Sequence, residues 1–434
     1  MRVNRRTFLR KAGGLAVVVG SGRTMSTRSL AADRAPHIVL RSSWQTINIG
    51  DIAHTPGALA LLERYLPEAR VTLWAANVGD NVRLLLERRF PQVAIHERRV
   101  SHDAPGDGLD RALEGTPLAD VLASADLVLH GSGPHIVSPD ALYAARALGR
   151  PYGVYGVTLG DLHDPLKETA GDARFFYCRD TASLEYLKGL RLPCPVQEFA
   201  PDATFAIDLR DDARADRYLT RHGLVDKQFL CVVPRLRWTP YPRLLAAAAK
   251  GDREAKAKLA ANDRHAESDH AKLRAAIVAW VRETGHKVLL CPEMTYEVPL
   301  LRPLLYDKLP EAVKKAVVVK EAYWLTDEAA STYARAAAVL SCEMHSPIIA
   351  VANGTPAIHV RQPTDTRKGQ MWRDVGLGEW LFEIDETDGA AIAARTVALV
   401  GNAEATRARL EAAMAIVRAR QQDSMAVVKR SCGV

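Results

Sequence analysis

The chain has 434 residues, of which 48% are hydrophobic and 25% are charged. These are the proportions of a soluble globular protein, so wholesale disorder is excluded, and the length favours two domains. Basic residues outnumber acidic ones by 58 to 51, but seven of the basic residues lie in residues 1–31, which contain no acid. The rest of the chain carries 51 of each and has no net charge to attract nucleic acid, so we expect no nucleic-acid partner.

The first 31 residues have the layout of a secretory signal. Arg5 and Arg6 precede a short apolar run at 12–20, and Ser29, Leu30 and Ala31 supply small residues for cleavage. This pattern predicts a twin-arginine signal peptide and an exported, periplasmic or extracytoplasmic protein. A basic N-terminus without a targeting role is the alternative. The apolar run is about half the ~20 residues that a membrane-spanning helix needs, and we expect no transmembrane span.

The six cysteines have no CxxC spacing and do not cluster with histidine. A disulfide framework is not expected in a chain of this length, and nothing in the pattern favours a zinc site. We therefore predict neither a metal nor a cofactor.

In chain order, short apolar runs alternate with helical patterns. We predict a helix over 57–66, and another that opens at Ser138-Pro139, with Ser138 as its N-cap and Pro139 as its first residue. A polar stretch that begins at Asp208 predicts a linker. After it we expect a solvated Ala/Lys-rich helix over 244–262 and, at the end of the chain, further helices. The strands are predicted over residues 37–44, 70–76, 126–130, 151–157 and 175–178, and then 229–233, 287–291, 316–320, 338–341 and 357–360.

This alternation is typical of α/β proteins with parallel sheets. The fold that we predict is two Rossmann-like, doubly wound domains that face each other across a cleft. Ligands bind such sheets at the carboxyl ends of the strands. The expected order is a signal at 1–31, a first domain at 36–207, a linker at 208–225, a second domain at 226–389 and C-terminal helices at 390–434.

Two loops at predicted strand ends in the first half are rich in glycine. Asn48, Gly50 and Asp51 follow the first strand, and there glycine permits a close backbone approach while the other two supply polar groups. Gly131 and Gly133 follow the strand at 126–130, in a GxG pattern that is weak by itself. A plain tight turn is the alternative interpretation of each.

Three further loops carry charge at strand ends. Arg179 and Asp180 follow the strand at 175–178, where Arg179 either holds an anion or makes a structural ion pair. The strand at 338–341 leads into Glu343 and His345, and Ser346 is expected to cap the next helix. The N-terminus of a helix favours anions, which predicts a phosphate or carboxylate beside His345. The basic loop that follows the strand at 357–360 suits an anionic or sugar ligand. The candidate ligand-binding residues in this loop are Arg361, Arg367 and Lys368.

In this order, the loops resemble the polysaccharide pyruvyl transferase family over about residues 40–365. The motifs are NIGD at 48–51, DLVLHGSG at 126–133, FYCRDTASLEYLK at 176–188 and SCEMHSPIIAVANGTPAI at 341–358. The resemblance implies an architecture similar to that of B-type glycosyltransferases. It also implies transfer of pyruvate from phosphoenolpyruvate to two hydroxyls of a sugar in a cell-envelope polysaccharide. The implied partners are a carbohydrate acceptor and an anionic donor.

The resemblance makes His345 the best candidate for an acid/base or donor-binding role. It matches Asn48, Gly50 and Asp51 to the family's N-terminal loop, and Arg179 and Asp180 to its Arg-Asp pair. Glu343 departs from the family, whose members typically have Arg at this position. Either this carboxylate pairs with a neighbouring cation, for which Arg361 and Arg367 are candidates, or it accepts hydrogen bonds from a sugar or acts as a base. The alternatives are a B-type glycosyltransferase and an exported, non-catalytic or diverged glycan-binding protein.

Overall fold

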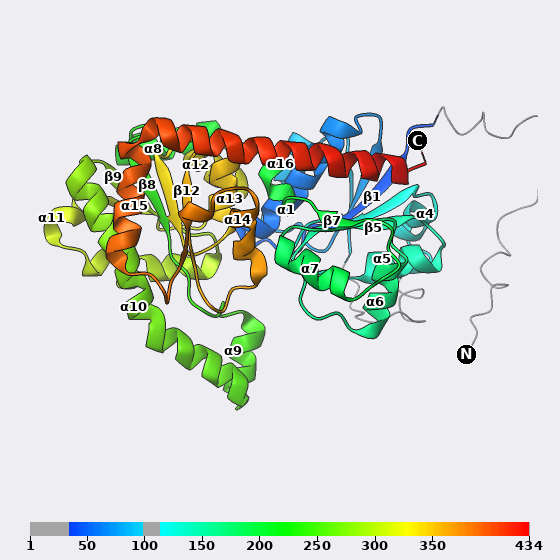
Figure 1. Cartoon of the computed structure of the whole chain (residues 1–434), viewed down its shortest axis with the longest axis horizontal. Coiled ribbons are helices and arrows are strands. Elements are labelled where there is room, and N and C mark those ends of the chain that lie inside the picture. The colour runs from blue at the N-terminus through cyan, green and yellow to red at the C-terminus, as the bar shows by residue number, and fades with distance from the viewer. Residues whose placement is uncertain (1–33, 99–112, 434) are drawn as a thin grey trace, which may run out of the picture. The chain divides into compact units, whose positions relative to one another are not determined.

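The strands belong to two parallel sheets that follow one another along the chain. The computed structural model describes residues 34–98 and 113–433 (Figure 1). The predicted signal at 1–31 lies outside the described residues. The α/β prediction with two doubly wound sheets is confirmed.

The first sheet has seven strands in the order β3-β2-β1-β4-β5-β6-β7. Side chains of β1 alternate between two apolar clusters, with Val39 facing one, and Ile38 and Leu40 the other. Each cluster packs under helices, which is why these strands appear as nearly continuous apolar runs. The strands are β1 His37–Ser42, β2 Arg70–Ala75, β3 Ala94–Glu97, β4 Leu127–His130, β5 Tyr152–Val157, β6 Phe176–Cys178 and β7 Gln197–Phe199.

The second sheet has six strands in the order β10-β9-β8-β11-β12-β13. In both sheets the strand order reverses beside the first strand, at β1/β4 and at β8/β11, and ligands of doubly wound sheets bind at such points. The strands are β8 Phe229–Val233, β9 Lys287–Leu290, β10 Val317–Val319, β11 Ala338–Ser341, β12 Ala357–Arg361 and β13 Leu381–Glu383.

Helices cover both sheets. In the first half they are α1 Ile49–Tyr65, α2 Val82–Arg89, α4 Pro117–Ala123, α5 Asp140–Ala147, α6 Asp164–Gly171, α7 Thr181–Gly189 and α8 Asp212–His222. In the second half they are α9 Pro242–Ala249, α10 Arg253–Thr284, α11 Glu311–Lys314, α12 Thr326–Arg335, α13 His345–Ala352, α14 Gln370–Asp374, α15 Gly389–Gly401 and α16 Ala403–Ser431. Short 3-10 or π segments are η2 Ala203–Ala206, η3 Thr295–Leu300, η4 Leu301–Leu305, η5 Tyr306–Lys308, η6 Arg367–Gly369 and η7 Gly378–Trp380.

Several helix boundaries differ from those predicted. Helix α1 begins at Ile49, eight residues earlier than expected, because the Asn48 side chain caps it. Ser138 is not a cap: it has φ of 52°, and α5 begins at Asp140. Ser346 is not one either, since α13 already begins at His345. The segment predicted as a linker contains helix α8, which packs on α12.

The last helix joins the two halves of the described chain. Helix α16 runs from the second sheet back along the first (red in Figure 1), where it packs against α1. There the hydroxyl of Ser424 lies 3.1 Å from that of Tyr155, and Lys429 pairs with Glu68 at 2.9 Å. Because α16 also packs against α13 and α15 of the second half, it ties the two halves together.

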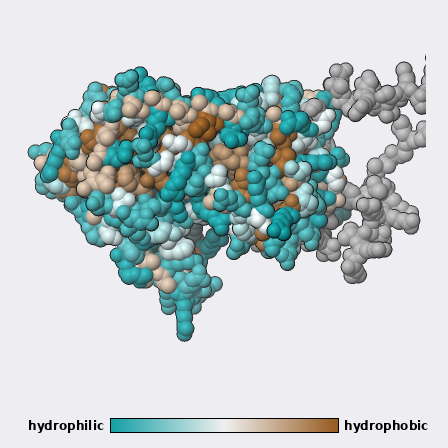
Figure 2. Space-filling model, in the orientation of Figure 1, coloured by the Kyte–Doolittle hydropathy of each residue, from teal (hydrophilic) through white to brown (hydrophobic). Residues whose placement is uncertain are grey.

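Helix α9 and the start of α10 form an arm that projects from the second half (Figure 1). Its surface is mainly hydrophilic, as Figure 2 shows, in agreement with the solvated character expected over 244–262. The single helix expected there is two helices, because α9 ends at Ala249 and α10 begins at Arg253. Nowhere in residues 34–98 and 113–433 is a helix long and apolar enough to cross a membrane.

Candidate active site

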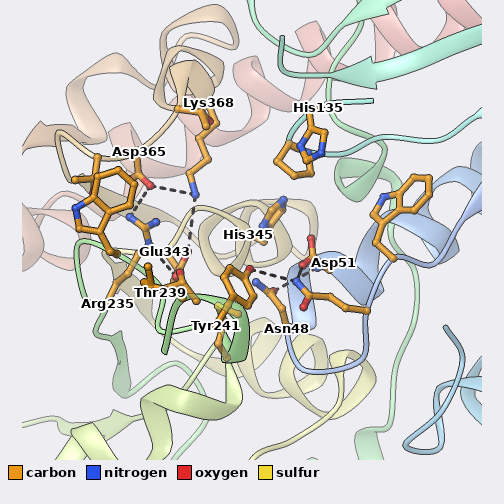
Figure 3. Close-up of a pocket in the computed structure, with 18 of the residues that line it drawn as sticks. Asn48, Asp51, His135, Arg235, Thr239, Tyr241, Glu343, His345, Asp365 and Lys368 are labelled. Atoms are coloured by element: carbon orange, nitrogen blue, oxygen red, sulfur yellow. Dashed lines mark hydrogen bonds and ion pairs between the residues drawn. The ribbon is translucent and has the colours of Figure 1, made fainter. Parts of the chain in front are cut away.

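A cavity of about 830 Å³ lies between the carboxyl edges of the two sheets (Figure 3). Its first-half wall includes Trp44, Asn48, Asp51 and Arg179. Six basic and three acidic side chains line it in total, so its wall favours anions. The six are Arg179, Arg235, Arg237, Arg243, Lys258 and Lys368, and the three are Asp51, Glu343 and Asp365.

The N-terminus of α1 packs directly on His345. Asn48 Oδ1 accepts hydrogen bonds from the backbone N–H groups of Gly50 at 2.7 Å and Asp51 at 3.3 Å, which fixes the first turn. A Cβ atom on Gly50 would lie 2.3 Å from the ring of His345, so only glycine fits here. The Asp51 carboxylate lines the cavity and accepts a hydrogen bond from the amide of Gln45.

His345 is the first residue of α13, and charged groups lie at both of its ring nitrogens. Nδ1 lies 3.4 Å from Glu293 Oε1. Nε2 lies 3.5 Å from Arg179 Nη1 and 4.0 Å from Asp202 Oδ2. Burial, with His54 close by, lowers the pKa of His345 to about 3, so its imidazole is neutral at neutral pH.

Arg179 is fully buried, and two of its three guanidinium nitrogens bind other side chains. Its Nη1 donates to Asp202 Oδ2 at 2.5 Å and its Nε to Thr158 Oγ1 at 2.8 Å. Nη2 has no hydrogen-bond partner among the described residues, although the side chain lines the cavity. Burial opposes ionisation, but His54 and Arg179 hold the pKa of Asp202 well below its usual range. The carboxylate therefore stays charged and fixes the guanidinium.

His54, Asp202 and His345 come close enough to offer ligands to one metal ion. However, Asp202 Oδ2 already binds Arg179, and its Oδ1 accepts from the Thr204 N–H at 2.8 Å and lies 3.1 Å from His54 Nδ1. A second cation would have to displace the guanidinium, so these residues do not fit a metal.

The N-terminus of α13 binds an anion of the protein itself. Glu293 Oε2 accepts the backbone N–H of Ser346 at 2.6 Å and its hydroxyl at 2.8 Å. Glu293 thus occupies this N–H group, and the phosphate or carboxylate expected beside His345 remains a prediction. Burial raises the pKa of Glu293 to about 7.

Glu343 is paired, but not with the cations that the sequence suggested. Its Oε1 lies 2.9 Å from Arg235 Nε and its Oε2 3.8 Å from Lys368 Nζ. Asp365 completes the group, 2.5 Å from Arg235 and 3.3 Å from Lys368 (Figure 3). Burial raises the pKa of Glu343, while Arg235 opposes this shift. The group is electrically balanced and holds both cations at the cavity wall.

The remaining predicted residues have other positions. Arg361 pairs with Glu383 at 3.1 Å, and the exposed Arg367 donates to the carbonyl of Ala182, so neither lines the cavity. Asp180 caps α7 through the N–H of Ser183 at 2.7 Å. Gly131 and Gly133 pack against Ser42 and Trp44 and, like Ser346, do not line the cavity.

The predicted residues that line the cavity are Asn48, Asp51, Arg179, Glu343, His345 and Lys368. Sequence reasoning missed Arg235, Asp365 and Glu293. Arg235 and Glu293 follow the carboxyl ends of β8 and β9 closely. The strand-end rule applied to these two loops would have found them.

Solved structures of glycosyltransferases and epimerases share this fold. A glycosyltransferase from Rickettsia africae has a TM-score of 0.57 at 7% identity, with 92% of this chain and 98% of that chain covered. UDP-GlcNAc 2-epimerase from Neisseria meningitidis has a TM-score of 0.56 at 10% identity, covering 91% and 100%. Anabaena HepE, in complex with UDP and glucose, has a TM-score of 0.53 at 13% identity, covering 91% and 100%. The fold is thus that of the two-domain, B-type glycosyltransferases and related epimerases.

The sequence itself assigns the family. Residues 48–362, more than half of the chain, match the polysaccharide pyruvyl transferase model, and the chain belongs to that family. It is therefore a transferase of the polysaccharide-modifying kind. No curated protein matches the chain.

Proposed function

We propose that the cavity transfers a pyruvyl group from phosphoenolpyruvate, or a closely related anion, to two hydroxyls of a cell-envelope sugar. The observation that carries this proposal is the buried Arg179, whose Nη2 has no partner among the described residues and which lines the cavity beside His345. An anion would supply the missing acceptor.

The cavity offers further groups for both ends of such a donor. Phosphoenolpyruvate carries a carboxylate and a phosphate, and guanidinium and ammonium groups bind both. Lys368 lies on the same cavity wall as the Glu343 group, and its Nζ points into the cavity (Figure 3). Arg179 and Lys368 thus supply two positive charges from the two halves of the chain.

A second group of cavity residues suits a sugar. Trp44, Trp238 and Tyr241 line it together with the polar side chains of Gln45 and Thr239. Aromatic faces cover the apolar face of a sugar ring, while amides and hydroxyls bind its hydroxyl groups.

The reaction adds one proton to the methylene carbon of the donor and removes two from the acceptor hydroxyls. Both hydroxyl oxygens form bonds to the central carbon of the donor, and its bond to the phosphate oxygen breaks. A neutral His345 can donate or accept a hydrogen bond at this centre. Asp51, which follows Gly50 in the first turn of α1, is the cavity carboxylate that we assign to accept a hydroxyl proton.

We also propose that the enzyme works outside the cytoplasm. The support is the sequence of residues 1–31, with Arg5 and Arg6 before a short apolar run. A twin-arginine signal would export the chain already folded, in keeping with six cysteines that are all buried and unpaired.

The test is calorimetric titration of the chain from Ala32 onward with phosphoenolpyruvate, followed by assay of phosphate release with sugar acceptors. We expect binding and turnover. Arg179→Lys keeps the charge but loses the forked donor, and it should weaken binding at least tenfold. Arg395→Lys, an exposed control, should bind as the parent does.

Three results would contradict the proposal. Binding of UDP-sugars in place of phosphoenolpyruvate would indicate a B-type glycosyltransferase. Binding of glycans without any donor would indicate a non-catalytic glycan-binding protein. Equal binding of phosphoenolpyruvate by the parent and by Arg179→Lys would show that Arg179 Nη2 does not bind the anion.

A further inference from the structure

We propose that Glu293 is a positioning residue that passes a proton to His345, so that the imidazole can protonate the donor's methylene carbon. This inference rests on the proposed function. Glu293 is fully buried and does not line the cavity, so it can act on the donor only through His345.

The two carboxyl oxygens of Glu293 have different neighbours. Oε2 is anchored by the N–H and hydroxyl groups of Ser346. Oε1 has no hydrogen-bond partner among the described residues and lies 3.4 Å from His345 Nδ1. A protonated Oε1 would donate to Nδ1 and leave the ring proton on Nε2, which lies 4.0 Å from Asp202 Oδ2. This tautomer gives up the hydrogen bond that Arg179 Nη1, which can only donate, otherwise makes to Nε2 at 3.5 Å.

The backbone of Glu293 is held as firmly as its side chain. Its N–H donates to Glu297 Oε2 at 2.6 Å, and its carbonyl accepts the N–H of Ile49 at 3.0 Å. Ile49 belongs to α1, whose first turn packs on the other side of the imidazole through Gly50. His345 is thus clamped between α1 and Glu293, which fixes the direction of Nε2.

The step balances as a relay. The Nε2–H bond breaks as the carbon–hydrogen bond forms, and Nδ1 takes the proton of Glu293 as its O–H bond breaks. The electron pair remains on the Glu293 carboxylate, which Ser346 stabilises with two hydrogen bonds. Of the two protons that the acceptor hydroxyls release, one restores Glu293 and the other leaves on the phosphate.

Charge around the pair is consistent with this direction of transfer. Burial raises the pKa of Glu293 to about 7 and lowers that of His345 to about 3, so near neutral pH the proton is on the carboxyl group in much of the protein. The titratable and charged groups that face the pair are His54 and Asp51 of α1, Arg179, Asp202, Glu297, Tyr323, Tyr333, Glu343 and Lys368.

The first experiment compares the pH dependence of turnover in the parent, Glu293→Gln and Glu293→Asp. The parent rate should fall as the pH rises above about 7, where Glu293 loses its proton. Glu293→Gln keeps the shape but has no proton to give, so kcat should fall roughly 10²- to 10⁴-fold with a small change in KM. The decline near pH 7 should vanish in Glu293→Gln, and Glu293→Asp should restore part of the rate.

Glu328→Gln is the matched control, because it makes the same change on another buried carboxyl group, which pairs with Lys320 and not with His345. It should keep the decline near pH 7, whatever its effect on stability. Parent-like turnover and pH dependence in Glu293→Gln would overturn the inference.

A second measurement separates this inference from the proposed function. Nitrogen NMR of the histidine rings, with His345 assigned from a His345→Gln variant, reports the tautomer without any substrate. The parent should carry its ring proton on Nε2, and the Nδ1 signal should change near pH 7. A different tautomer, or no change near pH 7, would overturn the inference even if phosphoenolpyruvate is the donor. The expected signal would uphold the pairing even if it is not.

Discussion

Replacing Gly50 with alanine tests the contact on which the site depends. The added Cβ would lie 2.3 Å from Cγ and Nδ1 of the His345 ring, whereas carbon atoms in contact are about 3.5 Å apart or more. The helix or the ring must therefore move by about 1 Å. Overpacking of this kind costs about 1–3 kcal/mol, and the better helix propensity of alanine offsets less than 1 kcal/mol of it.

Two effects are expected of Gly50→Ala. The melting temperature should fall by up to about 6 °C, at roughly 2 °C per kcal/mol for a chain of this size. Turnover should fall about 100-fold, because a displacement of about 1 Å moves the imidazole relative to Arg179 and Glu293. Differential scanning fluorimetry and the phosphate-release assay measure the two effects.

Gly153→Ala is the matched control. Its Cβ would lie 2.3 Å from the Phe175 ring, an equally severe clash, but neither residue lines the cavity. It should lower the melting temperature by a similar amount and leave turnover within about twofold of the parent. If Gly50→Ala melts and turns over like the parent, or if both variants lose activity equally, the described contact between α1 and His345 is wrong.

Three further predictions concern charged or titratable side chains. Glu343→Gln should weaken phosphoenolpyruvate binding about three- to tenfold in calorimetry, because Arg235 loses its charged partner; tighter binding would show that the carboxylate chiefly repels the donor. Burial lowers the pKa of His359 to about 3, whereas a histidine in the unfolded chain has a pKa of about 6.5. Below pH 6.5 the unfolded chain therefore takes up a proton that the folded chain does not, and the free energy of unfolding falls with the pH. The loss of unfolding free energy between pH 6.5 and 4.5, measured with urea, should therefore be about 2.5 kcal/mol smaller in His359→Gln, and an unchanged loss would contradict this. Replacing Arg5 and Arg6 with lysine should keep the protein in the cytoplasm on cell fractionation, and normal export would show that the signal was misread.

The sequence by itself determined the architecture and the region of the site. Buried parallel strands need apolar side chains on both faces, so their runs are visible in the residues, as in FLCVV at Phe229–Val233. The strand-end rule then indicated His345 and Arg179 as cavity residues, since the topology of doubly wound sheets brings such loops together.

Only the tertiary structure decided which charges meet. Arg361, Arg367 and Lys368 belong to one basic stretch of the sequence, yet only Lys368 lines the cavity. Whether a charged side chain faces a cavity depends on the path of the backbone and on whether a neighbouring group of opposite charge pairs with it. Arg361, for example, forms an ion pair with Glu383 and does not line the cavity.

The partners of the central residues are far apart in the chain. Arg235 contacts Glu343 from the loop after the neighbouring strand β8, and Glu293 contacts His345 from the loop after β9, two strands away from β11 in the second sheet. Gly50 contacts the same histidine from the other half of the chain. Local patterns reflect only nearby residues, whereas an ion pair or a van der Waals contact depends on distance in space. For that reason the position of His345 at the cavity could be predicted from the sequence, but its contact with the carboxyl group of Glu293 could not.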